Sequence, residues 1–271
     1  MMKYVSDAGF KYISIGFVDS KLFHGNSWES RIDQLNTLME KYHLSCVQSH
    51  LPCYDLTLSS EITDDKTEEA IKRGIRATVM LGAKWGDMHL RSSFNYNFSE
   101  SRARTDNKKH IDSYIETAAK CGAGIALENL PVFPDVPKWH LYSTHYEDIV
   151  SIADEFPQEH IGICWNFGHA HLAGLDQKQA LSYIGNRLKI THIHDNFLKG
   201  DDHLIPGTGN SKWSVPWENI MPALSETGYC GPLTLEVNYK PNPTAEGFAY
   251  YALKSVEYLE NMIGDKNEKS D

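Results

Sequence analysis

Acidic, amide and imidazole side chains lie near the carboxyl ends of four consecutive apolar segments of this sequence. They are Glu128, Asn166, His192 and Glu236, in segments 124–130, 161–167, 188–196 and 231–237. Buried carboxylates that face one another are costly unless a cation holds them. A divalent metal is therefore the economical explanation for this set. Oxygen ligands with one imidazole suit Mn²⁺, Mg²⁺ or Co²⁺, and Zn²⁺ gains as more histidines join.

Short apolar segments alternate with amphipathic helical segments along the whole chain. The expected strands are 12–17, 45–52, 84–90, 124–130, 161–167, 188–196 and 231–237. The expected helices between and after them are 31–42, 68–81, 108–121, 146–155, 177–184, 217–227 and 245–263. This alternation is typical of parallel βαβ units. With 271 residues, it predicts a single α/β domain, a TIM-type (β/α) barrel over 1–263 with a charged tail at 264–271.

The start of the sequence does not complete the strand count of an eight-stranded barrel. Residues 1–8 are helix-like and are followed by Gly9, with no strand before them. The prediction is therefore a barrel that lacks its first strand, either because the recorded start omits it or because the barrel closes in another way.

Strand phase predicts that the polar groups share one mouth. In segment 124–130, Ile125 and Leu127 occupy one phase while Ala126 and Glu128 occupy the other. One phase of a barrel strand faces the helices and the other faces the interior, and active sites form where the carboxyl ends meet. The phase of segment 84–90 is confused by Met88.

The chain resembles the xylose-isomerase-like barrel superfamily, which holds sugar isomerases and epimerases and the endonuclease IV type of apurinic-site endonuclease. The matching motifs are Ala8-Gly9-Phe10, Ser49-His50-Leu51-Pro52, Leu127-Glu128-Asn129, Gly168-His169-Ala170, His192-Ile193-His194-Asp195-Asn196, Pro206-Gly207-Thr208-Gly209 and Gly228-Tyr229-Cys230-Gly231-Pro232. The resemblance implies a metal held by a glutamate, an aspartate, a histidine and a second glutamate. Position 166 departs from this pattern, because Asn166 removes one negative charge and should weaken the site or shift its metal preference.

The endonuclease branch of the superfamily carries further metal ligands, and this chain has candidates for them. The resemblance implies additional metal or substrate contacts at His50, His89, His169, Asp201 and His203, and His194 is expected to join the polar network at the mouth.

The leading functional hypothesis is a metal-dependent sugar isomerase or epimerase that moves a proton next to a carbonyl through an enediolate. Glu128 and Glu236 would act as base and acid on the two sides of the substrate. A dehydratase using the same enolate is nearly indistinguishable from the sequence. The alternatives are a multi-zinc apurinic-site endonuclease-like phosphodiesterase and an inactive barrel with a sugar-sensing or partner-binding role, which Asn166 motivates.

Composition limits the partners and the setting. A formal net charge of −10 disfavours nucleic acid, and a sugar or polyol is the expected partner, with a homodimer as a further possibility. The five cysteines contain no C-x-x-C pair, so no disulfide framework or structural zinc site is indicated. We find neither a signal peptide nor an apolar run long enough for a membrane, and expect a cytoplasmic protein.

Overall fold

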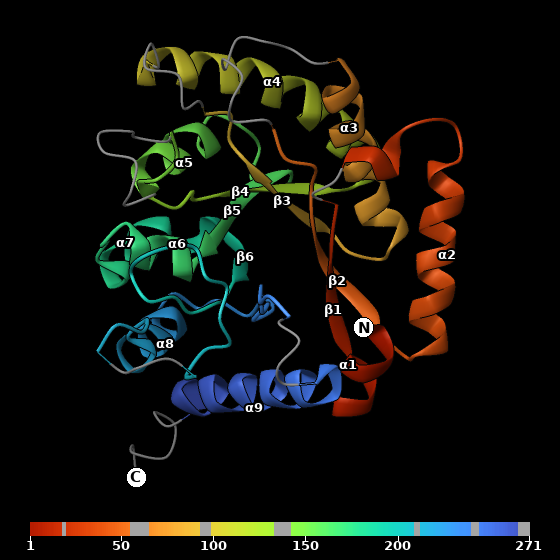
Figure 1. Cartoon of the computed structure of the whole chain (residues 1–271). Coiled ribbons are helices and arrows are strands. Elements are labelled where there is room, and N and C mark those ends of the chain that lie inside the picture. Colours follow the sequence, from red (N-terminus) through yellow and green to blue (C-terminus); the bar gives the residue numbers. More distant parts are fainter. Residues whose placement is uncertain are drawn as a thin grey trace.

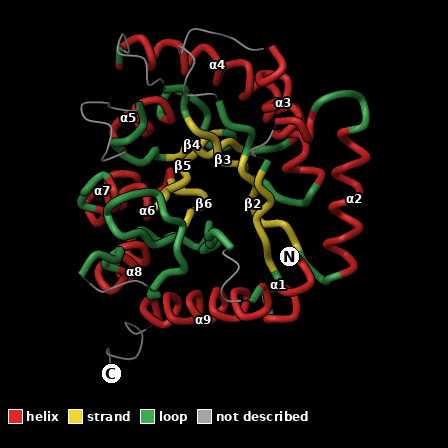
Figure 2. The backbone as a smooth tube through the Cα atoms, in the orientation of Figure 1, coloured by secondary structure: helices red, strands yellow, loops and turns green. Residues whose placement is uncertain are grey.

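Six parallel strands form one sheet in which the spatial order is the order along the chain. A computed structural model describes residues 1–17, 20–54, 65–92, 99–132, 142–208, 212–239 and 244–264. The strands are β1 (Tyr12–Gly16), β2 (Ser45–His50), β3 (Trp85–His89), β4 (Gly124–Glu128), β5 (Ile161–Asn166) and β6 (Leu188–His192). Figures 1 and 2 show this sheet curled at the centre of the molecule, with the helices around its outside. The predicted TIM-type barrel is confirmed.

Helices connect the strands and cover the outer face of the sheet. They are α1 (Met2–Ala8), α2 (Trp28–Lys41), α3 (Asp65–Met80), α4 (Glu100–Cys121), α5 (Tyr146–Ala153), α6 (Phe167–Leu172), α7 (Gln177–Ile184), α8 (Trp217–Glu226) and α9 (Ala245–Gly264). Two short 3₁₀ turns, Ser20–Phe23 and Gly185–Arg187, complete the described elements. In the described part of the chain, no helix is long and apolar enough to span a membrane. Gly209 and residues 265–271 of the expected tail lie outside the described residues.

Alternate residues of the strands face two different cores, as the phase of the sequence predicts. Ile125 and Leu127 are fully buried in the large core between sheet and helices. The opposite phase places Ala126, Cys164 and Ile190 in a small separate cluster inside the barrel. The inner cluster is a floor of apolar side chains, and the polar residues follow it at the carboxyl ends of the strands.

The short helix α6 was not expected, because the apolar Phe167 reads as a continuation of the strand. Asn166 ends β5, and its side-chain oxygen accepts a hydrogen bond from the backbone N–H of His169 at 3.0 Å. This bond caps the first turn of α6, and capping by asparagine is a strong signal for a helix start. The cap also fixes which end of the Asn166 amide faces the barrel.

The segment 231–237 pairs with the chain just after β6, at one bridge only. Leu235 is the parallel partner of Ile193, and Glu236 N–H donates to the Ile193 carbonyl at 3.0 Å. On the other side, a cavity of about 990 Å³ lined by Tyr12, Ile13, Leu233 and Leu235 separates this segment from β1. Among the described residues the barrel is therefore open at this point, which agrees with the expectation of a missing strand. Figure 1 shows α1 and α9 side by side across the opening.

Candidate active site

Strand register brings the polar side chains together in neighbouring pairs. His50 lies beside Asp87 across β2 and β3, His89 beside Glu128 across β3 and β4, and Asn166 beside His192 across β5 and β6. Neighbouring strands are about 4.8 Å apart, so side chains of the same phase at paired positions are in contact range. The register of the sheet therefore sets the relative positions of these six side chains.

The four residues expected at the metal centre converge on one point. Asn166 Nδ2 donates to Glu128 Oε1 at 2.9 Å and to Glu236 Oε2 at 3.0 Å. His192 Nδ1 lies 2.9 Å from Glu128 Oε1 and 3.3 Å from Glu236 Oε2. Glu128 is fully buried, whereas the Glu236 side chain is 30% exposed. One carboxylate thus lies under the other, and the outer one faces the mouth of the barrel.

Asn166 presents its nitrogen, not its oxygen, to the two glutamates. Its Oδ1 is already the acceptor for His169 N–H, and the backbone of Asn166 is held by Asn129, whose Oδ1 accepts from Asn166 N–H at 2.7 Å. Turning the amide over would leave two donors facing each other at the helix cap. The carbonyl coordination expected from the sequence is therefore not the arrangement that the hydrogen bonds favour.

The buried charges at this centre stabilise one another. Burial opposes ionisation of Glu128, but His192 and His89 outweigh it and hold the pKa of Glu128 well below its ordinary value. Burial also opposes the charged form of His192, yet the acidic groups around it raise its pKa well above the ordinary value. The pKa of Glu236 is lowered as well, because His192 more than offsets burial. Both carboxylates are thus ionised near neutral pH and are able to accept a proton.

A second layer of acidic and imidazole groups lies beneath this centre. Asp87 on β3 is fully buried, with Oδ2 at 3.4 Å from His50 Nε2 and Oδ1 at 3.2 Å from His192 Nε2. Asp87 is not among the site residues predicted from the sequence, because Met88 obscures the phase of this strand. In the structure Met88 packs in the outer core. The alternation of Trp85, Asp87 and His89 was the signal that could have revealed it.

His89 links Glu128 to a cysteine at the edge of the site. Its Nε2 lies 3.1 Å from Glu128 Oε2, and its Nδ1 lies 3.7 Å from Cys53 Sγ. Burial opposes ionisation of the Cys53 thiol, but His89 offsets it, and the pKa of Cys53 is below its ordinary value. Together with His50, these two residues form a group whose nitrogen and sulfur atoms are close enough to hold a metal.

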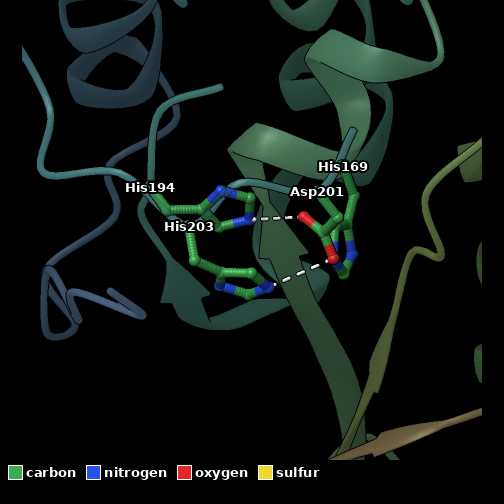
Figure 3. Close-up of side chains that lie close together, drawn as sticks. All are labelled: His169, His194, Asp201 and His203. Atoms are coloured by element: carbon green, nitrogen blue, oxygen red, sulfur yellow. Dashed lines mark hydrogen bonds and ion pairs between the residues drawn. The ribbon is translucent and has the colours of Figure 1, made fainter. Parts of the chain in front are cut away.

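Three further histidines, His169, His194 and His203, surround Asp201 (Figure 3). Asp201 Oδ2 lies 3.2 Å from His169 Nε2 and 3.1 Å from His203 Nε2, and Oδ1 lies 3.6 Å from His194 Nε2. Figure 3 shows the rings of His194 and His203 both directed at this carboxylate. Three imidazoles and one carboxylate within ligand distance are a donor set that suits Zn²⁺.

The protonation of this cluster is divided unevenly between its imidazoles. Burial, together with the neighbouring imidazoles of His169 and His203, lowers the pKa of His194 to about 3. Burial also opposes the charged form of His203, but its hydrogen bond with Asp201 dominates and raises the pKa to about 9. A neutral His194 leaves a free nitrogen lone pair, which is the form that binds a metal.

The donor atoms of the glutamate centre fit a divalent cation through three groups. Glu128, His192 and Glu236 each offer one ligand atom, and these atoms lie within 4.8 Å of one another. Asn166 does not fit as a fourth ligand in its present orientation, because its amide nitrogen cannot coordinate a cation. The set is therefore one oxygen ligand short of the pattern that the sequence resemblance implies.

Comparison with known proteins agrees with the fold and with these motifs. The model of the xylose isomerase-like TIM barrel family matches residues 2–256. The chain belongs to this family. The resemblance inferred from the sequence motifs is thereby confirmed.

Relatives span different shares of the chain. Protein y4fM of Sinorhizobium fredii is 30% identical over 116 residues, which are 42% of this chain and 36% of that protein, so the match spans about a third of that relative. Protein MJ1311 of Methanocaldococcus jannaschii is 27% identical over 248 residues, 88% of this chain and 76% of that protein. Both are described as uncharacterized.

Solved structures cover nearly the whole chain. A D-tagatose 3-epimerase-like protein is 24% identical with a TM-score of 0.75, covering 97% of this chain and 92% of its own. A D-psicose 3-epimerase, solved in the presence of D-fructose, is 14% identical with a TM-score of 0.75, covering 97% of this chain and 92% of its own. These likenesses establish the barrel fold.

Proposed function

We propose that this protein is a sugar isomerase or epimerase that moves a proton at a carbon next to a carbonyl of a ketose, keto-sugar or cyclic polyol derivative. The observation that carries the proposal is the convergence of Glu128 and Glu236, two ionised carboxylates, on the single nitrogen of Asn166 at 2.9 and 3.0 Å. A reaction that removes a proton and then returns one needs two such groups near the same carbon.

The solved structures of similar fold support a ketose substrate. Two of them are a D-tagatose 3-epimerase-like protein and a D-psicose 3-epimerase. Inversion at carbon 3 of such a sugar requires a proton to leave one face and to return on the other. The pair of carboxylates in this chain supplies both roles without a further residue.

Each residue of the centre has a distinct part in this proposal. Glu236 is partly exposed at the mouth and contacts the substrate first, while Glu128 lies fully buried below it. His192 contacts both carboxylates and holds them ionised before the proton is taken. Asn166 keeps the two side chains apart and oriented through its two donated hydrogen bonds. The carboxylate on one face accepts the proton, while the other takes up a proton from water and delivers it to the opposite face, and the first then releases its proton to solvent.

A divalent cation completes the proposal. Glu128, His192 and Glu236 would hold Mn²⁺, Zn²⁺, Co²⁺ or Mg²⁺, which when bound polarises the substrate carbonyl as a Lewis acid. The shortage of one oxygen ligand favours weak binding at this point and makes the activity dependent on added metal.

Deuterium exchange tests the proton transfer directly. Incubation of the metal-supplied protein with D-psicose, D-tagatose or D-fructose in D₂O is expected to place solvent deuterium on the carbon next to the carbonyl, detected by NMR. Glu236→Gln should abolish the exchange, because the amide cannot accept the proton. Glu40→Gln, which changes an exposed acid on α2, is the matched control. Unreduced exchange in Glu236→Gln refutes the assigned role.

A multi-zinc phosphodiesterase is the second candidate, and the two additional ligand groups favour it. His50, Cys53 and His89 form one, and the residues around Asp201 form the other. The net charge of −10 disfavours a nucleic-acid substrate. Cleavage of DNA at an abasic site by the zinc-loaded protein, without any exchange on sugars, supports this candidate over the first.

A further inference from the structure

Asp87 is a buried acid that the proposed proton transfer does not use. Its side chain is fully buried beneath the two glutamates, and neither of its carboxylate oxygens accepts a hydrogen bond from the described residues. Glu128 Oε2, which is also fully buried, has no hydrogen-bond partner in that part of the chain either. Three carboxylate oxygens are thus turned toward the interior of the barrel without a hydrogen bond from the described residues, and the nearest nitrogen to Glu128 Oε2 that an ion pair gives is His89 Nε2 at 3.1 Å.

Buried carboxylate oxygens of this kind need a positive partner. Removing an ion from water costs several kcal/mol, by order of magnitude, unless a charge or a metal compensates it. The imidazole nitrogens nearest to Asp87 lie at 3.2 and 3.4 Å but do not meet the geometry of a hydrogen bond. The oxygens are therefore close to nitrogen atoms without being bonded to them, which is the spacing of atoms around a shared ion.

The orientation of His50 matches that of a metal ligand. Its Nδ1 lies 2.8 Å from the Leu51 carbonyl oxygen, so this nitrogen carries the proton and donates it. Its Nε2 is then left with a lone pair that faces Asp87 Oδ2 at 3.4 Å and Glu128 Oε2 at 3.8 Å. A backbone carbonyl that fixes the tautomer in this way is typical of metal-binding histidines.

The distances agree with a small divalent ion. Metal bonds of about 2.1 Å separate adjacent ligand atoms by roughly 3.0 to 3.5 Å in octahedral or tetrahedral geometry. The ligand atoms of His50, Asp87 and Glu128 all lie within 4.8 Å of one another, and all three residues are buried.

We propose that His50 Nε2, the Asp87 carboxylate and Glu128 Oε2 form a cation site one layer deeper than the glutamate pair, here called the inner site. Asn166 and His192 already contact Glu128 Oε1 and Glu236 Oε2. The oxygens of the inner site accept no hydrogen bond from the described residues, although His89 Nε2 lies 3.1 Å from Glu128 Oε2 and His192 Nε2 lies 3.2 Å from Asp87 Oδ1. The inner site therefore binds its cation more tightly than the glutamate pair does. It stands independently of the sugar chemistry, because it rests on burial and geometry alone.

Binding of Mn²⁺, counted by electron paramagnetic resonance of the free ion, tests the inner site. The measurement uses the full chain with the Asp201→Asn change as background, which weakens the histidine cluster. Asp87→Asn keeps the shape of the side chain and is expected to weaken the tightest site by about 100-fold or more, since even indirect partners of ligands contribute 10–100-fold. Glu236→Gln removes a ligand of the glutamate pair but none of the inner site, so it should leave the tightest site within about threefold. Glu40→Gln, which changes an exposed acid on α2, is the matched control.

Two results overturn the inner site. If Glu236→Gln abolishes tight binding and Asp87→Asn does not, the cation lies between the glutamates. If neither change weakens Mn²⁺ binding, the charge of Asp87 is neutralised by protonated imidazoles rather than by a cation. His50→Gln provides a second variant and should reproduce the loss seen with Asp87→Asn, with circular dichroism confirming that each variant is folded. Deuterium exchange, measured separately, reports on the proposed function whether or not the inner site exists.

Discussion

Asn166→Asp replaces the amide between the two glutamates by a third carboxylate. In the native chain, Asn166 Nδ2 donates a hydrogen bond to Glu128 at 2.9 Å and another to Glu236 at 3.0 Å. The aspartate loses both donors and places a negative charge at the same distance from two others. The cap of α6 is retained, because the carboxylate still accepts from His169 N–H. The change therefore isolates the electrostatics of the centre.

The expected cost follows from the distances. Two like charges about 3 Å apart repel by roughly 5 kcal/mol at an effective dielectric constant of about 20. Protonation sets an upper limit, because holding an aspartate neutral at pH 7 costs about 4 kcal/mol from its ordinary pKa of about 3.9. We expect the variant without metal to be about 4 kcal/mol less stable than the native chain, a decrease in Tm of roughly 10 °C.

A divalent cation should reverse most of this loss. The variant offers three carboxylates and His192, and a cation at 1,000 times its Kd contributes about 4 kcal/mol to stability. Thermal unfolding of both proteins with EDTA and with Mn²⁺ measures the difference. Asn196→Asp is the control, since Asn196 is equally buried but its Nδ2 donates to the Gly168 carbonyl. Two results would show that the Asn166 amide is not the neutral partner of the glutamates. One is that Asn166→Asp is as stable as the native chain in EDTA. The other is that Mn²⁺ stabilises Asn166→Asp and the native chain equally.

Two further predictions concern stability away from the glutamates. Burial opposes ionisation of Glu68, but hydrogen bonds from His110 and other neighbours lower its pKa. The charge of Glu68 therefore stabilises the fold above the unfolded pKa of about 4.5, and this contribution disappears as the pH falls through the folded pKa. In urea unfolding, Glu68→Gln should lower the free energy of unfolding by about 2 kcal/mol at pH 7 and by little at pH 3, and a pH-independent difference would contradict this. A Cβ on Gly168 would lie 2.0 Å from Cε1 of the buried His194 ring. Gly168→Ala should therefore lower the free energy of unfolding by about 2 kcal/mol, whereas Gly200→Ala, with open space around it, should change it little. Equal effects of the two changes would show that the His194 ring moves freely.

The strands and the glutamate centre were predictable because both follow from one repeating pattern. Apolar residues alternate along the strands, and a parallel sheet fixes which neighbours meet. Glu128, Asn166, His192 and Glu236 each continue the inward phase of their segment, so their convergence follows from periodicity alone. The same pattern gave a wrong strand end at β5, because the apolar Phe167 reads as part of the strand although it begins α6. The hydrogen bond by which Asn166 caps this helix is a contact in three dimensions that the pattern of residue types does not show.

Three other features of the structure were not predicted correctly, for different physical reasons. Segment 231–237 has the composition of a strand, but a strand also needs hydrogen-bonded neighbours. Among the described residues, its only strand pairing is the bridge between Ile193 and Leu235. Helix α4 begins at Glu100 rather than at residue 108, because its first two turns are polar and carry no apolar period. The orientation of the Asn166 amide depends on a backbone N–H in the next element, which no pattern of residue types encodes.

Asn166 and Asp87 are best understood together. The family resemblance implies an acid at position 166, and this chain has an amide there, while β3 carries an acid at an inward position one layer below. His192 contacts both levels, with Nδ1 toward the glutamates and Nε2 toward Asp87. Carboxylates therefore lie on both sides of the His192 ring. Because Asp87 lies deeper than the two glutamates, a cation bound at the proposed inner site would leave the carboxylate of Glu236 at the mouth available as a base.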